Sequence, residues 1–466
     1  MQLRPSTSRS FITSWVFTFS ALLLLAALPV HAIELDLEND ESIKSAAKAL
    51  ARGCKSYYTG DNPGDVPGNL PPPYYWWEAG ALFGAFIDYW FYTGDDTYND
   101  ITMQAMVHQA SQDRDFMPTN QTRAEGNDDQ AFWAMTAMSA AERNFPNPQP
   151  DQPQWLALVQ AVFNLQVGRW DKGACGGGLR WQIFRFNNGF NYKNTISNGC
   201  FFNMAARLAT YTGNETYAKW AEIAWDWMES VGFVTENFHF FDGADDTNNC
   251  TQINRIQWTY NAGVCLLGAA HMFQFTNNSD KWKTRVQGIV DGLDVFFFNN
   301  TNIMFEVACE PNGKCETDQR SFKAYLARWM AATTQVAPFT AEQLLPKLRA
   351  SAMAAAKVCT GTTVGQQCPL KWTTETFEGE TGLGEQMAAL EVIQSNLISK
   401  TPPPLTNLTG GTSRGDPNAG LQRGRGDQTP DIATRKITAG DRAGAVILTV
   451  LLILVLLVSP YWLLCV

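Results

Sequence analysis

Residues 124–133 read Ala-Glu-Gly-Asn-Asp-Asp-Gln-Ala-Phe-Trp, with two adjacent carboxylates at the start of an apolar segment. Apolar residues then occupy nearly every side of the predicted helix, which indicates a helix that is buried all round. Asp128 and Asp129 therefore stand where a turn enters a core, and buried acids are costly unless they are paired or used. Helix capping is the alternative, because Asn and Asp favour the first turn of a helix. Capping explains one acid readily and the run Asn-Asp-Asp less well.

Apolar helices of this kind recur along the chain, and each is followed by an amphipathic helix. The turn between the two is nearly the same string at 92–98, Tyr-Thr-Gly-Asp-Asp-Thr-Tyr, and at 211–217, Tyr-Thr-Gly-Asn-Glu-Thr-Tyr. The pattern predicts apolar helices near 77–92, 128–143, 197–211, 258–275, 319–335 and 382–397. It predicts amphipathic helices near 40–52, 95–112, 153–166, 214–231, 280–297 and 340–357.

Helical hairpins that repeat at intervals of roughly 50–65 residues indicate a repeat architecture. Six apolar helices inside six amphipathic ones predict an all-α fold, an (α/α)6 barrel in which helix 40–52 completes the last pair. The competing fold, an open solenoid, would need polar capping repeats, which the sequence does not show. Strand-like runs are short, at 179–183 and 238–241, so we expect small β-hairpins at the rim of a single domain.

The N-terminal residues predict secretion. Residues 1–32 combine two arginines, an apolar run and a cleavage-like sequence of small residues, which is typical of a signal peptide. A transmembrane anchor is the alternative. A single folded domain is then expected at 33–400.

The C-terminal residues predict attachment to the membrane. A segment rich in Pro, Gly and Thr at 401–439 is expected to be a flexible stalk. Residues 440–466 predict a GPI-anchor signal that is removed, with Ala439 or Gly440 as the lipidation site. The spacer after these residues is short, which keeps a tail-anchored form as the alternative. We expect a protein secreted through the endoplasmic reticulum to the outer face of the plasma membrane and the cell wall.

Cysteines and glycosylation sequons fit an extracellular chain. Ten cysteines in an oxidising compartment indicate disulfides before metal ligands, and neither a metal nor a cofactor is expected. Cys309 with Cys315 and Cys359 with Cys368 are expected to pair locally, while Cys54, Cys175, Cys200, Cys250 and Cys265 could supply two more pairs and one free thiol. Sequons for N-glycosylation occur at Asn120, Asn214, Asn249, Asn277, Asn299 and Asn407.

Charge and aromatic content narrow the class of partner. A net charge of -10 argues against a nucleic-acid surface, which would need a basic stripe. The 16 Trp, 13 Tyr and 28 Phe residues suggest a large core together with platforms on which sugar rings could stack. Ordinary core packing accounts for most of them.

Four motifs, taken in order, resemble glycoside hydrolase family 76, and in particular its fungal GPI-anchored cell-wall members. They are Trp-Trp-Glu-Ala-Gly at 76–80, Gly-Asn-Asp-Asp-Gln at 126–130, Asn-Thr-Ile-Ser-Asn-Gly at 194–199 and Thr-Tyr-Asn-Ala-Gly at 259–263. The resemblance covers about 35–400 and implies an (α/α)6 barrel that acts on α-mannosides with a retaining mechanism. It implies that Asp128 is the nucleophile and Asp129 the general acid/base.

The spacing of the two acids allows this assignment independently. Retaining glycosidases need carboxyl groups about 5–5.5 Å apart, and neighbouring residues have Cα atoms about 3.8 Å apart. Like charges at such a distance should also raise the proton affinity of one acid, as the mechanism requires.

Further positions are expected to bind substrate, although packing or capping is an equally good explanation of each. Trp77, Trp133 and Tyr260 could stack on mannose rings, and Glu78, Asn127, Asn194, Asn198, Asp242, Asn261 and Arg328 could bond hydroxyls. The acidic loop at 242–246 lacks the spacing of an EF-hand, so we treat it as a rim loop and predict no calcium site there.

The sequence therefore predicts a monomeric retaining enzyme of the fungal cell wall. Its donor would be an α-mannoside, either α-1,6-mannan or the mannose core of a GPI glycan, and the resemblance implies transfer of GPI-anchored proteins to wall glucan. A plain endo-α-1,6-mannanase is the first alternative, because hydrolysis and transfer share one covalent intermediate. A non-catalytic glycan-binding wall protein is the second.

Overall fold

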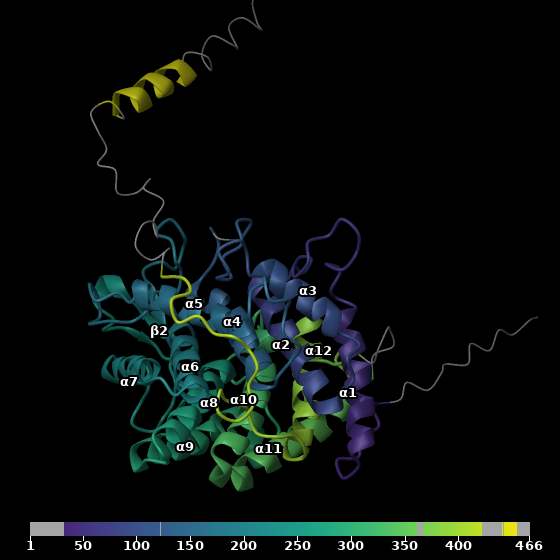
Figure 1. Ribbon diagram of the computed structural model, residues 1–466. Helices are drawn as coiled ribbons and strands as arrows, with labels where there is room; N and C mark the ends of the chain where they lie inside the picture. The colour runs from purple at the N-terminus through teal and green to yellow at the C-terminus, as the bar shows by residue number, and fades with distance from the viewer. Residues whose placement is uncertain (1–31, 122, 361–366, 422–439, 441, 454–466) are drawn as a thin grey trace, which may run out of the picture.

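The computed structural model describes residues 32–121, 123–360, 367–421, 440 and 442–453. Residues 40–394 form two concentric layers of helices (Figure 1). The inner helices are α2 (Trp76–Thr93), α4 (Asn127–Glu142), α6 (Thr195–Thr212), α8 (Thr259–Phe275), α10 (Phe322–Val336) and α12 (Leu383–Gln394). The outer helices are α1 (Asp40–Lys55), α3 (Asn99–Gln109), α5 (Trp155–Arg169), α7 (Glu215–Ser230), α9 (Asp280–Gly292) and α11 (Ala341–Val358).

The inner helices close into a ring. Each packs against the next inner helix along the chain, and α12 packs against α2. The opening helix α1 packs against α12, so it is the outer partner of the last inner helix. The predicted (α/α)6 barrel is confirmed, and closure leaves no inner helix with an unpartnered apolar face.

The two similar turn strings have a common physical cause. Gly94 ends α2 and Gly213 ends α6, with φ angles of 76° and 72°. This left-handed conformation costs glycine little, and it lets the amide of each glycine cap the end of its helix. The chain can then reverse direction into the following outer helix.

A small antiparallel sheet lies at one end of the ring. Its strands are β1 (Tyr192–Asn194), β2 (Gly243–Asp245) and β3 (Ile253–Asn254), in the order β1-β2-β3. The predicted runs at 179–183 and 238–241 form only isolated bridges, such as Arg180 to Lys193. Since Asn194 is also the N-cap of α6, the sheet leads directly into the ring.

The disulfides confirm the two predicted local pairs and contradict the pairing expected for the other cysteines. Cys309–Cys315 and Cys359–Cys368 are confirmed, and a third bond joins Cys175 to Cys250. The expectation of two further pairs among the remaining five is wrong, because Cys54, Cys200 and Cys265 are buried free thiols. Each of these three lies on a helix of the barrel, where a cysteine packs as a small apolar residue.

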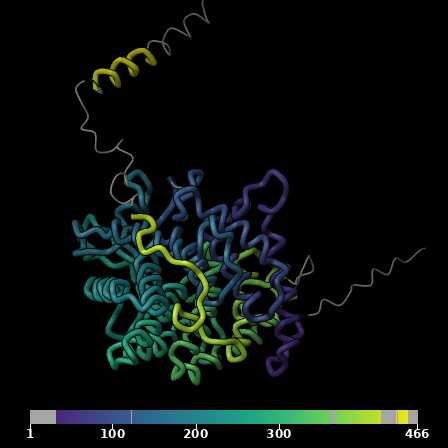
Figure 2. Tube along the Cα trace, viewed as in Figure 1, coloured from purple at the N-terminus to yellow at the C-terminus, as the bar shows by residue number. Residues whose placement is uncertain are grey.

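A C-terminal strap, residues 401–421, lies along the outside of the barrel beside α5 (Figure 2). Its hydrogen bonds run from Leu405 N to Glu142 O, from Asn407 N to Tyr211 O, from Leu156 N to Ser413 Oγ, and from Asn164 Nδ2 to Pro417 O and Ala419 O. The prediction of a flexible stalk is therefore wrong for these residues, because the barrel satisfies much of their backbone. Residues 422–439, which include Ala439, lie outside the described residues.

The two ends of the chain leave several expectations untested. Residues 1–31 and 454–466 lie outside the described residues, so the signal peptide and most of the anchor signal stay predictions, as does lipidation at Ala439 or Gly440. Across the described parts of the chain, no helix has the length and apolar character needed to span a bilayer. All six sequon asparagines are exposed, namely Asn120, Asn214, Asn249, Asn277, Asn299 and Asn407.

Candidate active site

The N-terminal ends of the inner helices surround a cavity of about 620 Å³. Nine aromatic residues line it: Tyr75, Trp76, Trp77, Phe132, Trp181, Tyr192, Trp258, Tyr260 and Phe322. Six acidic residues line it as well: Glu125, Asp128, Asp129, Asp242, Glu316 and Asp318. None of the described residues that line the cavity is Lys or Arg. Flat apolar faces beside hydrogen-bonding carboxylates suit a sugar better than an anion.

The two aspartates differ in their hydrogen bonding. Gly126 is the N-cap of α4, and its amide donates to Asp129 Oδ2 at 2.7 Å. Asp129 therefore closes the first turn and satisfies one of the orphan amides of the helix. Asp128, which points into the cavity, is buried, and its Oδ1 has no hydrogen-bond partner among the described residues. A buried carboxylate oxygen without a partner is the feature that capping leaves unexplained.

The environment favours protonation of this pair. Burial raises the pKa of Asp128 well above its ordinary value, and the charge of Asp129 raises it further. Burial also raises the pKa of Asp129 to about 6, although the amide of Gly126 opposes that shift. Because the two carboxyls interact, they titrate as a pair, and burial favours the state of the pair that retains one proton.

Hydrogen bonds fix two other acids of the cavity, Asp242 and Asp318. Tyr192 Oη donates to Asp242 Oδ2 at 2.6 Å, and Trp258 Nε1 donates to Asp242 Oδ1 at 3.0 Å. On another wall, Trp77 Nε1 donates to Asp318 Oδ1 at 2.9 Å. Burial raises the pKa of both Asp242 and Asp318, against these hydrogen bonds. Each aromatic donor thus orients one carboxylate toward the cavity.

Four of the ten predicted substrate-binding residues line the cavity, namely Trp77, Asn194, Asp242 and Tyr260. Tyr260 stacks on Phe322 with ring centroids 3.8 Å apart. Asn194 is the N-cap of α6, and its side chain accepts from Ser197 N. The ring brings these residues together with Asp128 and Asp129, although they come from four different parts of the chain.

Three further predicted residues brace the wall behind the cavity instead of lining it. Glu78 is buried and accepts from Tyr75 N at 2.7 Å, which caps α2, and burial raises its pKa to about 9. Asn127 donates to Arg180 O at 2.8 Å. Trp133 is fully buried and donates to the carbonyl of Trp76. Successive helix positions point about 100° apart, so a neighbour of a lining residue faces the adjacent helix.

The last three predicted residues lie deeper in the barrel. Both polar groups of the Asn198 side chain bond the backbone of Leu179, at 2.7 and 3.0 Å. Asn261 is fully buried and does not line the cavity. Arg328 pairs with Asp88 at 2.8 Å and with Glu391 at 2.6 Å, as part of a buried ion network. These three residues do not line the cavity, and their contact with substrate stays a prediction.

Several residues that line the cavity were not predicted from the sequence. Trp181 and Tyr192 lie on either side of a rim hairpin, and the strand-like run at 179–183 was the available signal. Glu316 and Asp318 follow the Cys309–Cys315 loop, and nothing in their local sequence marks them. They reach the cavity because η4 (Gln319–Ser321) precedes the N-terminus of α10.

Comparisons with known proteins agree with this geometry. The model of glycosyl hydrolase family 76 matches residues 42–408. Mannan endo-1,6-alpha-mannosidase DCW1 of Saccharomyces cerevisiae is 48% identical over 442 residues, which cover 94% of this chain and 97% of that protein. Mannan endo-1,6-alpha-mannosidase DFG5 of the same organism is 45% identical over 461 residues, which cover 98% and 99%.

Two solved structures are also similar. The crystal structure of Dfg5 from Chaetomium thermophilum in complex with glucosamine has 47% sequence identity and a TM-score of 0.80, and the match covers 83% of this chain and 97% of that one. An inactive variant of the α-1,6-mannanase GH76A of Salegentibacter sp. HEL1_6, in complex with α-1,6-mannotriose, has 16% identity and a TM-score of 0.61. That match covers 76% of this chain and 99% of the mannanase, and it concerns the fold alone.

Proposed function

The chain belongs to glycosyl hydrolase family 76 and is an enzyme of that family, and on this premise we propose that it cleaves α-1,6-mannosidic bonds with retention of configuration. The observation that carries the proposal is the pair Asp128 and Asp129, which opens α4 into the acidic, aromatic cavity. Two adjacent carboxyls that hold one proton between them supply a nucleophile and an acid in one place. The curated relatives, named as mannan endo-1,6-alpha-mannosidases, support the choice of bond.

Asp128 acts as the nucleophile and Asp129 as the general acid/base. The carboxylate of Asp128 attacks the anomeric carbon, the bond to the leaving oxygen breaks, and Asp129 donates its proton to that oxygen. The reactive complex needs an ionised Asp128 and a protonated Asp129, so the proton that the pair shares must reside on Asp129. Positive charge that develops at the anomeric carbon favours this distribution, because it stabilises the ionised form of the acid beside it.

The donor is held by residues on three sides of the cavity. Trp77 and Tyr260 offer ring faces, while Asn194 and Asp242 are placed to bond hydroxyls. Phe132 and Trp258 complete the apolar wall. Binding energy at these positions orients the anomeric carbon over Asp128, which is the purpose of a substrate-positioning pocket.

The acidic lining favours a donor that carries an amine. A GPI glycan joins its mannose core to a glucosamine with a free amino group, whereas plain mannan has none. The relative from Chaetomium thermophilum was crystallised with glucosamine, which supports the same choice. We therefore favour the mannose core of GPI glycans over α-1,6-mannan as donor, and wall glucan as acceptor. Attachment through a GPI anchor at Ala439 or Gly440, at the cell surface, would place the enzyme beside both.

Replacement of each aspartate by alanine tests the assignment of roles. With a mannosyl donor that has an activated leaving group, added azide should restore Asp128→Ala and give the β-mannosyl azide, because azide takes the place of the nucleophile. Asp129→Ala should form the covalent intermediate and give the α-mannosyl azide. The opposite pair of products would exchange the roles. Wild-type activity in both variants would remove the enzyme hypothesis in favour of a non-catalytic glycan-binding protein.

Product analysis distinguishes transfer from hydrolysis. Residues 33–421, which include the strap, are incubated with a GPI-type mannoside and a β-glucan oligosaccharide, and the products are read by mass. A product that joins the mannosyl fragment to the glucan supports the transferase. Its absence at every acceptor concentration, with hydrolysis intact, would leave a plain endo-α-1,6-mannanase.

A further inference from the structure

A rim hairpin, residues 180–193, presents an exposed indole at the mouth of the cavity. Trp181 lines the cavity and yet is 36% exposed, whereas the lining residues Trp77 and Phe132 are 8% and 4% exposed. The cavity therefore has an inner set of aromatic rings and an outer set, which consists of Trp181 and the 54% exposed Tyr75 among the described lining residues. A mannosyl fragment bound covalently to Asp128 occupies the inner part, so a second sugar must approach from the outer part.

Backbone contacts hold Trp181 beside the reacting acids. Its amide donates to Tyr192 O at 2.7 Å, and its carbonyl accepts from Asn127 N at 2.8 Å. Asn127 immediately precedes Asp128 in the chain, so the indole is tied to the N-terminus of α4. The ring lies against Gly189, whose φ is 88°, and a methyl group there would lie roughly 1 Å inside van der Waals contact with the ring. One face of the indole is thus supported by backbone.

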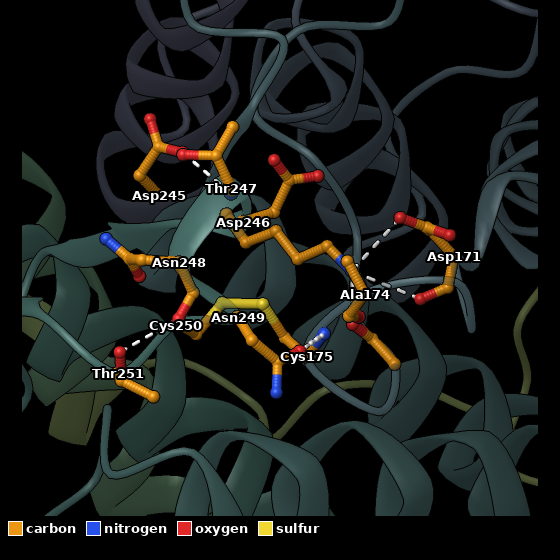
Figure 3. Close-up of a disulfide and its surroundings, with 12 residues drawn as sticks. Asp171, Ala174, Cys175, Asp245, Asp246, Thr247, Asn248, Asn249, Cys250 and Thr251 are labelled. Carbon is orange, nitrogen blue, oxygen red and sulfur yellow. Dashed lines mark hydrogen bonds and ion pairs between the residues drawn. A yellow bond between two sulfur atoms is a disulfide. The ribbon is translucent and has the colours of Figure 1, made fainter.

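The base of the hairpin is anchored on its other side. Lys193 is fully buried, and its ammonium donates to the carbonyls of Ala174 and Gly177 at 2.8 and 2.6 Å. Figure 3 shows the Cys175–Cys250 disulfide, with Ala174 close to it. A satisfied buried ammonium and a covalent cross-link together fix this loop.

Ion pairs add to this anchor. Arg180 pairs with Asp171 at 2.7 Å and also with Asp246, so it bridges the two loops that the disulfide joins. The hairpin therefore leaves a rigid base, and Trp181 does not need to be ordered when a sugar arrives. A platform that is already in place avoids the entropy that ordering a loop would cost.

We propose that Trp181 is the platform on which the acceptor sugar stacks, and that it sets the partition between transfer and hydrolysis. The proposal rests on the proposed function, since it concerns the second half of the same reaction. The chemistry of the indole favours a β-linked glucosyl acceptor. The ring hydroxyls of a β-linked glucosyl residue are all equatorial and leave flat C–H faces, whereas the axial hydroxyl of mannose interrupts one face.

The stacked acceptor completes the transfer step. Its hydroxyl oxygen bonds to the anomeric carbon, the ester bond to Asp128 breaks, and the hydroxyl proton passes to the carboxylate of Asp129. In hydrolysis, water takes the place of that hydroxyl in the same step. An acceptor that dwells on Trp181 both supplies the hydroxyl and displaces water from the outer part of the cavity.

Substitution of the indole tests the proposal through the product ratio. We compare wild type, Trp181→Ala, Trp181→Phe and Phe186→Ala with one mannosyl donor and subsaturating β-1,3-glucan oligosaccharide. The ratio of transfer product to hydrolysis product should fall about tenfold in Trp181→Ala, the loss expected for one aromatic contact, and should recover in part in Trp181→Phe. Phe186 is an exposed aromatic residue of the same hairpin that does not line the cavity, so Phe186→Ala should keep the wild-type ratio.

Two measurements, the product ratio and the affinity for the acceptor, distinguish failure of the Trp181 platform from failure of the proposed transferase function. An unchanged ratio in Trp181→Ala would overturn the platform and leave the transferase standing. Should wild type yield no transfer product, transfer itself is refuted, and affinity for the oligosaccharide decides about the platform. That affinity is measured by calorimetry on the Asp128→Asn, Asp129→Asn double variant with and without Trp181→Ala. A loss of about tenfold supports the platform, and equal affinities overturn it.

Discussion

Replacement of Gly126 by alanine would place a methyl group against the carboxylate of Asp128. Gly126 has φ of -90° and ψ of 166°, which alanine adopts without strain, and the added Cβ would lie 3.1 Å from the carbonyl oxygen of Trp181 and 3.3 Å from Asp129 Oδ2, which need to shift by only a few tenths of an ångström. The added Cβ would lie about 1 Å inside van der Waals contact with Asp128 Oδ1, and the carboxylate must move by about that distance. A displacement of about 1 Å from the reactive geometry costs roughly 100-fold in rate, or about 2.7 kcal/mol of transition-state stabilisation.

The assay compares kcat and the melting temperature of Gly126→Ala with those of a matched control. Gly168 lies in α5 with open space around the position of a Cβ, so Gly168→Ala should keep kcat and gain about 0.5–1 kcal/mol in stability. Gly126→Ala should lose activity about 100-fold and remain folded, because its amide can still cap α4 through Asp129. A wild-type kcat in a folded Gly126→Ala protein would mean that Asp128 does not react, or that its position is not critical.

Three further predictions concern stability. Arg328→Met leaves the buried carboxylate of Glu391 without its ion-pair partner, while Asp88 keeps Arg143, and this should cost about 3–5 kcal/mol in chemical denaturation; lost activity at full stability would instead support the substrate-binding role. Burial raises the pKa of Glu306 to about 8, so the folded state favours the protonated carboxyl. The stability that this preference contributes is fully present below about pH 4.5 and is lost as pH rises through 8. Glu306→Gln should therefore flatten the pH dependence of the unfolding free energy over that window, and an unchanged profile would contradict the shift. Removal of the strap 401–421 should lower the free energy of unfolding by a few kcal/mol, since its hydrogen bonds to the barrel are lost; equal melting temperatures with and without it would show that the strap contributes nothing.

The sequence was sufficient for the barrel because the relevant signal is local and repeated. A helix that is apolar all round can only be buried, and a one-sided helix can only cover it, so six pairs specify two layers. The strings at 92–98 and 211–217 also had a local cause, the left-handed glycines at 94 and 213. For the same reason the acid pair was found, since Asp128 and Asp129 are adjacent in the chain.

The sequence was misleading where a polar residue stood in an apolar helix. Asn198, Asn261 and Arg328 looked functional because burial of a polar group demands a reason, yet two of them bond or pair with the barrel and all three lie outside the cavity. The amino-acid composition of the strap also led to a wrong prediction. A segment rich in Pro, Gly and Thr was expected to be flexible, although its order depends on Asn164 of α5, which lies more than 200 residues away in the chain.

From its sequence alone, the chain determines the number and character of its helices, the closure of the ring and the identity of two adjacent acids. Only the tertiary structure decides which faces of those helices meet in the cavity. Trp77 and Asp318 are 241 residues apart and share one hydrogen bond, and Trp181 approaches Asp128 through a rim hairpin. Hydrophobic periodicity records which side of a helix leaves water, whereas the rotation of each helix against its neighbours depends on contacts between distant segments.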